Sequence, residues 1–154
     1  MDIEEVIHDT TKELLEKLDL EFTKIDISEE EKDLYTINIS SDNPSLLIGY
    51  HGDNIHAMQQ LLKVLLWKKT DSEHFHISVD VDNYRRRQEE SALNLALRKA
   101  EKARQYRKTQ SLPPMNPALR RKIHLHFMGP GFDDLETFSE GEGEKRHLVI
   151  KPKA

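Results

Sequence analysis

Hydrophobic positions near the start of the chain recur at intervals of three and four, which predicts an amphipathic helix. The residues on this expected face are Ile3, Val6, Ile7, Thr10, Leu14, Leu15 and Leu18. Strict alternation of apolar and polar positions then predicts strands over residues 25–27 and 35–39, joined through the acidic connection 28–33. A third alternating run, residues 75–81, predicts another strand.

Between the second and third strands the pattern predicts two helices. Asn43 is the expected N-cap of a short helix, with Pro44 at its first position. The turn Gly49-Tyr50-His51-Gly52 follows, and then a longer helix. We expect this longer helix to bury Ile55, Met58, Leu61, Leu62, Leu65 and Leu66.

The second half of the chain predicts a long helix of about 25 residues from Asn83, then a short helix and a hairpin. The inner stripe of the long helix is expected to be Leu93, Ala96, Leu97, Ala100 and Ala103. Asn116 is the expected cap of the short helix, whose inward residues are Leu119, Ile123 and Phe127. The hairpin strands are expected over 135–139 and 146–150.

Composition narrows the class of protein. Of 154 residues, 36% are hydrophobic and 33% are charged, so we expect small cores and much solvated surface. The absence of cysteine excludes disulfides and thiolate metal sites. The N-terminus has no signal-peptide pattern, and no apolar run is long enough to span a bilayer. We therefore expect a cytoplasmic protein with no integral membrane segment.

The net charge of −5 hides a strong asymmetry along the chain. Residues 1–44 carry 14 acidic and 4 basic side chains, whereas residues 81–125 carry 4 acidic and 12 basic ones. A local excess of positive charge favours binding of a polyanion, because neutralised phosphates release counterions. A long helix with a solvated basic face explains the same excess, and charge alone does not separate the two interpretations.

The motif Gly49-x-x-Gly52 lies between two expected helices. Glycines without a Cβ allow close approach of a ligand to the backbone, and the start of the following helix favours a phosphate. A tight helix–helix turn is the alternative explanation, and the bare spacing does not exclude it. The order helix, strand, strand, helix, Gly-x-x-Gly, helix, strand resembles a type II KH domain, whose loop clamps single-stranded backbone. Such loops usually carry Lys or Arg in the middle, where this chain has Tyr50 and His51.

The second motif is Arg120-Arg121-Lys122-Ile123-His124. Positions four apart share a helix face, so Arg120 and His124 are expected to present adjacent donors to a phosphate or a base edge. With Pro114-Met-Asn-Pro before it and Ser139-Glu-Gly-Glu-Gly after it, the motif resembles the R-three-H domain.

Together the two modules resemble the Jag family (SpoIIIJ-associated proteins), in a short form without the additional N-terminal Jag domain. The resemblance implies an α+β fold, with a type II KH domain over residues 1–82 and a small R-three-H domain over residues 83–154. It also implies a cytoplasmic binder of single-stranded RNA, or DNA, linked to bacterial cell elongation or division, with a second small KH protein as a partner. The residues expected to contact nucleic acid are Gly49, Tyr50, His51, Gly52, Arg85, Arg86, Arg120, Arg121 and His124.

Two other classes of function remain open at this point. A protein-interaction adaptor would use the acidic residues 1–44 to dock a basic partner, with weak or absent binding of nucleic acid. A phosphodiesterase would need Asp80 and Asp82 to act with His124, but the sequence positions neither a nucleophile nor a metal among them. We expect no catalysis, no cofactor and no metal.

Overall fold

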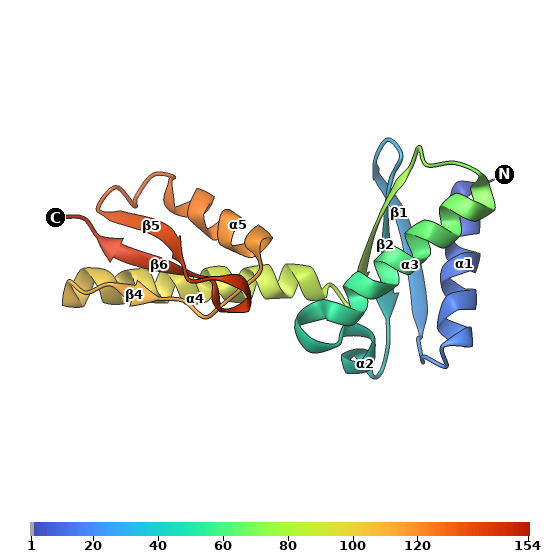
Figure 1. Ribbon diagram of the computed structural model, residues 1–154, viewed down its shortest axis with the longest axis horizontal. Helices are drawn as coiled ribbons and strands as arrows, with labels where there is room; N and C mark the ends of the chain where they lie inside the picture. The colour runs from blue at the N-terminus through green and yellow to red at the C-terminus, as the bar shows by residue number, and fades with distance from the viewer. Residues whose placement is uncertain (1) are drawn as a thin grey trace. The chain divides into compact units, whose positions relative to one another are not determined.

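The computed structural model describes residues 2–154, in which helices and strands mix in the α+β arrangement that the family resemblance implies (Figure 1). Their contacts form two units, one up to Arg85 and one over Arg86–Ala154. The first unit contains α1 (Ile3–Lys17), β1 (Lys24–Glu31), β2 (Leu34–Ser40), α2 (Pro44–Ile48), the 3-10 turn η1 (Tyr50–Gly52), α3 (Asp53–Thr70) and β3 (His76–Val81). Helix α4 (Tyr84–Tyr106) begins there and continues into the second unit, which adds β4 (Gln110–Ser111), α5 (Pro117–Phe127), β5 (Leu135–Glu140), the 3-10 turn η2 (Gly143–Lys145) and β6 (His147–Pro152).

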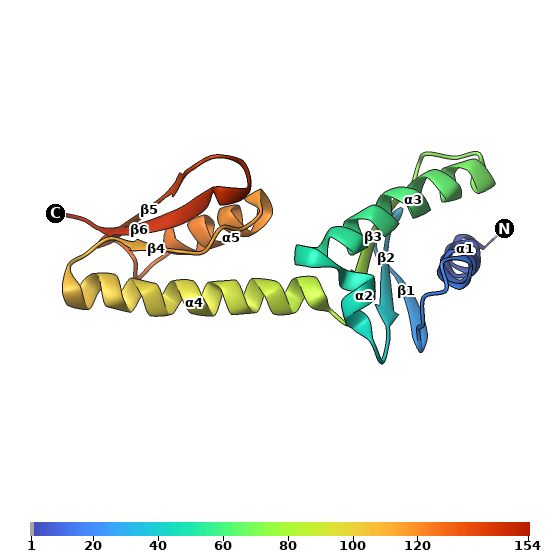
Figure 2. The same cartoon turned by 60° about the horizontal axis from the view of Figure 1, so that its bottom comes forward.

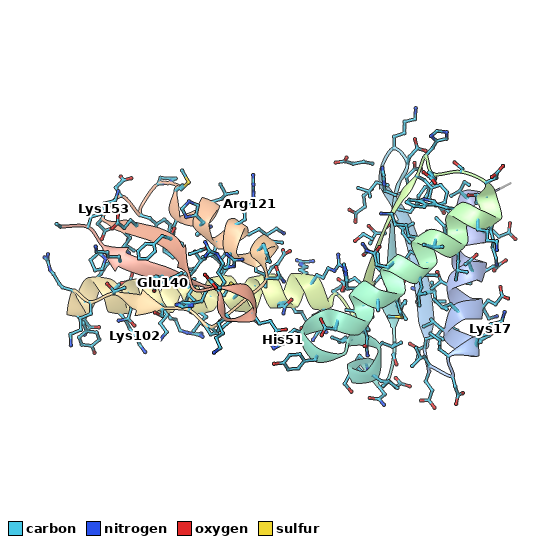
Figure 3. All side chains as sticks on the ribbon, viewed as in Figure 1. Lys17, His51, Lys102, Arg121, Glu140 and Lys153 are labelled. Carbon is cyan, nitrogen blue, oxygen red and sulfur yellow. The ribbon has the colours of Figure 1, made fainter. Side chains whose placement is uncertain are left out.

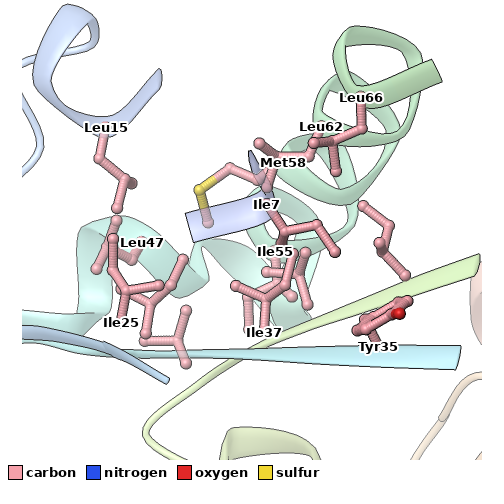
Figure 4. Close-up of a cluster of buried hydrophobic side chains, with 14 of the residues drawn as sticks. Ile7, Leu15, Ile25, Tyr35, Ile37, Leu47, Ile55, Met58, Leu62 and Leu66 are labelled. Carbon is pink, nitrogen blue, oxygen red and sulfur yellow. The ribbon is translucent and has the colours of Figure 1, made fainter. Parts of the chain in front are cut away.

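The first unit is a three-stranded sheet of order β1-β2-β3 with helices on one face. Strands β1 and β2 are antiparallel, and β2 and β3 are parallel. The register aligns Ile37 with Ile27 on one side and Val79 on the other, so the apolar positions of the strands share a face. Residues of α1, α2 and α3 pack on that face in a core of aliphatic side chains (Figure 4). A parallel pair needs a crossover connection. Here the crossover is α2, the glycine loop and α3, which is why the loop lies between two helices.

Three sequence expectations for this unit need correction. Residues 28–33 are not a free connection, because β1 continues to Glu31 with a register shift between Glu29 and Glu31. The extension is an exposed part of an edge strand, so it needs no alternating apolar residues. Asn43 occupies the N-cap position of α2, with Pro44 in the first turn, as predicted, but its side chain makes no capping hydrogen bond and instead accepts one from the Ser45 hydroxyl at 3.1 Å.

The third correction concerns α3. Ile55, Met58, Leu62 and Leu66 are buried as predicted, but Leu61 is 50% exposed and Leu65 is 37% exposed. One face of α3 covers the sheet, and both leucines fall outside it. The sequence prediction included both leucines because they are apolar, so the predicted buried face of α3 was wider than the one in the structure.

The second unit is a three-stranded antiparallel sheet of order β4-β6-β5, packed against α4 and α5 (Figure 2). The predicted hairpin is confirmed as β5 and β6. Its core joins Ala96, Ala100, Ala103, Leu112, Ile123, Phe127, Leu135, Leu148 and Ile150. The alanines of α4 are buried as expected, whereas Leu93 and Leu97 are only half-buried. Strand β4 was not predicted, because two residues carry no periodic signal.

Ends and edges of the second unit are held by polar contacts. The Asn116 side chain accepts a hydrogen bond from the Leu119 amide at 2.9 Å, which confirms the predicted cap of α5. Arg104 of α4 donates to both carboxylate oxygens of Asp134 (2.8 and 3.0 Å) and to the Gly131 carbonyl (2.7 Å). This hydrogen bond from Arg104 lowers the pKa of Asp134. The bidentate contact therefore ties α4 to the segment that leads into β5.

Within residues 2–154, no helix has both the length and the apolar content that crossing a membrane requires.

Candidate nucleic-acid interface

The glycine loop has a backbone that side-chain-bearing residues rarely adopt. Gly49 has φ 72° and ψ −174°, a region essentially restricted to glycine. His51 and Gly52 are both left-handed, with φ of 51° and 83°. A Cβ added to Gly52 would meet the Tyr84 ring at 3.3 Å. The two glycines are thus required by the shape of the loop even before any ligand is considered.

The middle of the loop presents two rings rather than two cations. Tyr50 is 78% exposed, and its ring lies edge-on to that of His51 with centroids 4.1 Å apart. His51 is also exposed, and Figure 3 labels it at the turn. An exposed aromatic ring beside flexible single-stranded nucleic acid offers a stacking surface for a base.

Arg85 and Arg86 are adjacent in sequence but differ in their surroundings. Arg85 is half-buried, and its guanidinium donates to Gln59 Oε1 (3.1 Å) and Ser78 Oγ (3.4 Å). Gln59 Oε1 also accepts a hydrogen bond from the Val79 amide at 3.0 Å, so the cluster covers the outer edge of β3. Arg86 is exposed and donates to Glu90 at 3.2 Å. Arg85 is therefore largely an anchor within its own unit, and Arg86 is a solvated cation.

Arg120 and His124 both reach from α5 to β5, as their shared helix face predicts. Arg120 donates to Ser139 Oγ at 3.1 Å and to the Met115 carbonyl at 3.2 Å. His124 Nδ1 lies 2.5 Å from Thr137 Oγ1. Both side chains are half-buried, so they are ordered by the protein and still reachable from solvent. Two contacts occupy only part of the guanidinium's five N–H groups, and Nε2 of His124 is not engaged by Thr137.

Arg120 and His124 contact Ser139 and Thr137, and the spacing of the two pairs along the chain explains why both contacts form. Four residues along a helix advance about 6 Å, and two along a strand advance about 6.6 Å. Arg120 and His124 on α5 therefore match Ser139 and Thr137 on β5. The spacing of two between hydroxyl residues was present in the sequence, but only the packing of α5 on β5 gives it meaning.

Further exposed cations accompany these residues. Arg121 extends from α5 and makes no ion pair with another described residue (Figure 3). The same holds, among residues 2–154, for five cations of α4 and its C-terminal end, of which Figure 3 labels Lys102. They are the exposed Arg98, Lys102, Arg107 and Lys108 and the half-buried Lys99. Tyr106, between them, is 59% exposed.

The structure also shows residues that the sequence did not single out. Thr137 and Gln59 hold predicted site residues in place and belong to no chemical motif. Ser139 was noted only as the first residue of the Ser139-Glu-Gly-Glu-Gly run, and the structure shows it as the partner of Arg120. Within the described chain, no three His, Asp or Glu side chains gather as metal ligands.

The glycine loop and the Arg120–His124 pair each lie in a domain of a known family. Residues 4–79 match the KH domain of KhpA and KhpB, and residues 90–152 match the R-three-H domain. The class is thus a protein with a KhpA/KhpB-type KH domain followed by an R-three-H domain.

Curated relatives match most of this chain. The RNA-binding protein KhpB of Clostridium symbiosum is 32% identical over 97% of this chain and 68% of its own length. That of Bacillus subtilis is 32% identical over 81% of this chain and 60% of its own length. The KhpB protein of Lactiplantibacillus plantarum is 33% identical over 75% of this chain but only 35% of its own length. The chain belongs to the KhpB family, which confirms the resemblance to Jag proteins.

Proposed function

We propose that this chain is a non-catalytic binder of single-stranded RNA. The observation that carries the proposal is the pair Arg120 and His124, held on the hydroxyl groups of β5 with donors left over. Donors that are already ordered lose little conformational entropy when they bind an anion. The names of the KhpB relatives, each called an RNA-binding protein, support the same function.

In this proposal the two modules contribute different contacts. Arg120, with Arg121 and His124, binds phosphates, because a guanidinium matches two phosphate oxygens at once. The loop Gly49–Gly52 approaches the sugar–phosphate backbone, and Tyr50 stacks on a base. Arg86 and the exposed cations of α4 add non-specific attraction, while Arg85 contributes through the groups it holds at the edge of β3.

The experiment is titration of fluorescently labelled, mixed-sequence single-stranded RNA and DNA with the protein at several salt concentrations. Each neutralised phosphate should contribute about −0.7 to the slope of log affinity against log salt. Arg120→Glu and Gly52→Asp should each weaken binding strongly while far-UV circular dichroism stays unchanged. Lys32→Glu, which makes the same charge reversal at the exposed β1–β2 turn, is the matched control and should change affinity little. Absence of any salt-sensitive binding by the unmodified protein would contradict the proposal.

We also propose a second small KH protein as a partner, bound on the outer face of α3. Leu61, Val64 and Leu65 are 50%, 62% and 37% exposed and lie at helical spacing on one side of α3. Exposed apolar side chains gathered on one face are typical of an interaction surface. Light scattering of mixtures should detect a heterodimer that Leu61→Glu abolishes and Leu18→Glu, at an equally exposed leucine of the first unit, leaves intact. A heterodimer that survives Leu61→Glu would contradict this surface.

A protein-interaction adaptor is the competing function. The observation that favours it is the presence of Tyr50 and His51 where KH loops usually carry cations, beside a first segment of strongly negative charge. Pull-downs from lysate with and without nuclease separate the two functions, since adaptor contacts survive nuclease treatment. Cleavage of labelled RNA that depends on His124 would instead establish a phosphodiesterase. We place the protein in the cytoplasm, in the control of cell elongation or division, on the family resemblance alone.

A further inference from the structure

The first glycine of the loop is in contact with a side chain that no motif includes. Asn54 is the second residue of α3, and its Nδ2 donates a hydrogen bond to the Leu46 carbonyl of α2 at 2.7 Å. A Cβ added to Gly49 would lie 2.5 Å from Asn54 Cγ and 2.8 Å from both atoms of its amide. The Asn54 amide therefore lies directly over the Cα of Gly49.

This contact is not an ordinary helix cap. A capping side chain stands before the helix and accepts hydrogen bonds from its first amides. Asn54 lies inside α3, and its amide nitrogen donates backward across the loop to the end of α2. The capping position of α3 is Gly52, which has no side chain to make such a bond.

The backbone of the loop has few hydrogen bonds of its own outside the flanking helices. The Gly49 amide donates to the Ser45 carbonyl at 2.9 Å, which closes the end of α2. The Gly52 amide donates to the Gly49 carbonyl at 3.4 Å, a long and therefore weak bond. The bridge from Asn54 to Leu46 is thus a short connection between the two helices that flank the loop.

We infer that Asn54 is a positioning residue, which holds the loop Gly49–Gly52 in its binding conformation before RNA arrives. The inference rests on the proposed function, but the contacts of Asn54 that hold the loop are already present in the free protein. The amide of Asn54 joins α2 to α3, and it occupies the place where a Cβ of residue 49 would lie. The first glycine is then required by an internal neighbour as well as by the close approach of a ligand.

Asn54→Ala removes the bridge, and Asn54→Asp keeps the shape but replaces the donor with an acceptor that faces the Leu46 carbonyl. Both variants should shift the backbone amide resonances of Gly49–Gly52 in the free protein and increase their fast motion. Both should weaken RNA binding roughly three- to tenfold, the effect of losing one hydrogen bond. Asn94→Ala, at an exposed asparagine of α4, is the matched control and should change neither the loop resonances nor the affinity.

A double-mutant cycle separates positioning from general stability. Gly49→Ala should weaken RNA binding less in the Asn54→Ala background than in the unmodified protein, because the added methyl group no longer meets an amide. Additive effects of the two changes would overturn the inference, as would unchanged loop resonances in both Asn54 variants. If Asn54→Ala lowers the melting temperature of the whole unit, Asn54→Ser is used in its place, because it keeps a polar group at this position. Shifted resonances of Gly49–Gly52 in Asn54→Ser would then support the inference, and unchanged ones would overturn it.

The outcomes for this inference and for RNA binding are distinct. If the unmodified protein binds no RNA, the proposed function fails, and the inference is judged on the free loop alone. If it binds RNA and the Asn54 variants bind equally well with an unchanged loop, RNA binding stands and the inference fails.

Discussion

The two candidate sites of this protein are built from different parts of the chain. In the KH module the site is backbone, shaped by Gly49 and Gly52 in conformations with positive φ. In the R-three-H module the site is side chain, with Arg120 and His124 resting on two hydroxyl groups. A backbone site is sensitive to any added Cβ, whatever its chemistry. A side-chain site is sensitive to particular atoms and tolerates changes next to them.

The largest effect is expected at the backbone site. Gly49→Ala forces a residue with a Cβ into a glycine-only region, which costs about 1–3 kcal/mol, and adds the contact with Asn54. We expect a lower free energy of unfolding in urea and at least a tenfold loss of RNA affinity. Gly52→Ala is the comparison: its left-handed φ costs about 1–2 kcal/mol, and its Cβ would lie 3.3 Å from the Tyr84 ring. If Gly52→Ala proves the more damaging of the two, our account of the loop is wrong.

The next largest effect is expected at Arg120. Arg120→Ala removes the guanidinium and should lower RNA affinity about tenfold, since hydrogen bonds to charged groups are worth roughly 1.5–3 kcal/mol. Arg120→Lys should recover little of this loss, because an ammonium group does not reproduce the planar fork. Fluorescence anisotropy checks both, with Lys32→Ala, at the exposed β1–β2 turn outside the proposed site, as the control. Full recovery with lysine would show that only charge matters at this position.

A smaller effect is expected from the hydroxyl that holds the imidazole. Thr137→Val is close to isosteric and removes the partner of His124 Nδ1. We expect a loss of RNA affinity of roughly threefold, typical of one neutral hydrogen bond. The ¹⁵N chemical shifts of the His124 ring should change at the same time, because the ring loses its orienting partner. Unchanged ring shifts would mean that Thr137 does not set the state of His124.

The smallest effect is expected on folding stability, through the pH dependence of one ion pair in each unit. Arg104 lowers the pKa of Asp134 in the second unit, and Lys17 with Lys69 lowers the pKa of Glu13 in the first. A carboxyl whose folded pKa is depressed stabilises the fold above its unfolded pKa and loses this contribution as pH falls through the folded pKa. Asp134→Asn should therefore destabilise the protein slightly at pH 7 and not at all once the pH has fallen through the depressed folded pKa of the Asp134 carboxyl.

Glu13→Gln is the matched change in the first unit, on an exposed α1–α3 bridge. Urea unfolding at pH 7 and at a series of lower pH values compares the two variants. We expect the larger effect for Asp134, because Arg104 binds it through two nitrogens and also stacks 5.6 Å from the Phe132 ring centre. Equal effects would show that bidentate geometry adds nothing here.

The sequence pattern was sufficient for the order of the elements, for both motifs and for most of the core. Periodicity works because a buried face must be apolar at the repeat of its own secondary structure. It failed where burial does not dictate the residue: on the exposed extension of β1, in the two-residue β4, and at Leu61 and Leu65 on the outer side of α3.

By itself the sequence determined that this protein has a glycine loop between two helices and an Arg–His pair on one helix face, because both depend on spacing along the chain. Only the tertiary structure decided that Asn54 rests on Gly49, that Thr137 and Ser139 hold the pair, and that Arg85 turns inward to Gln59. Each of these contacts joins residues whose separation in sequence has no fixed relation to their separation in space. The packing of one element on another sets that distance, and no local pattern records it.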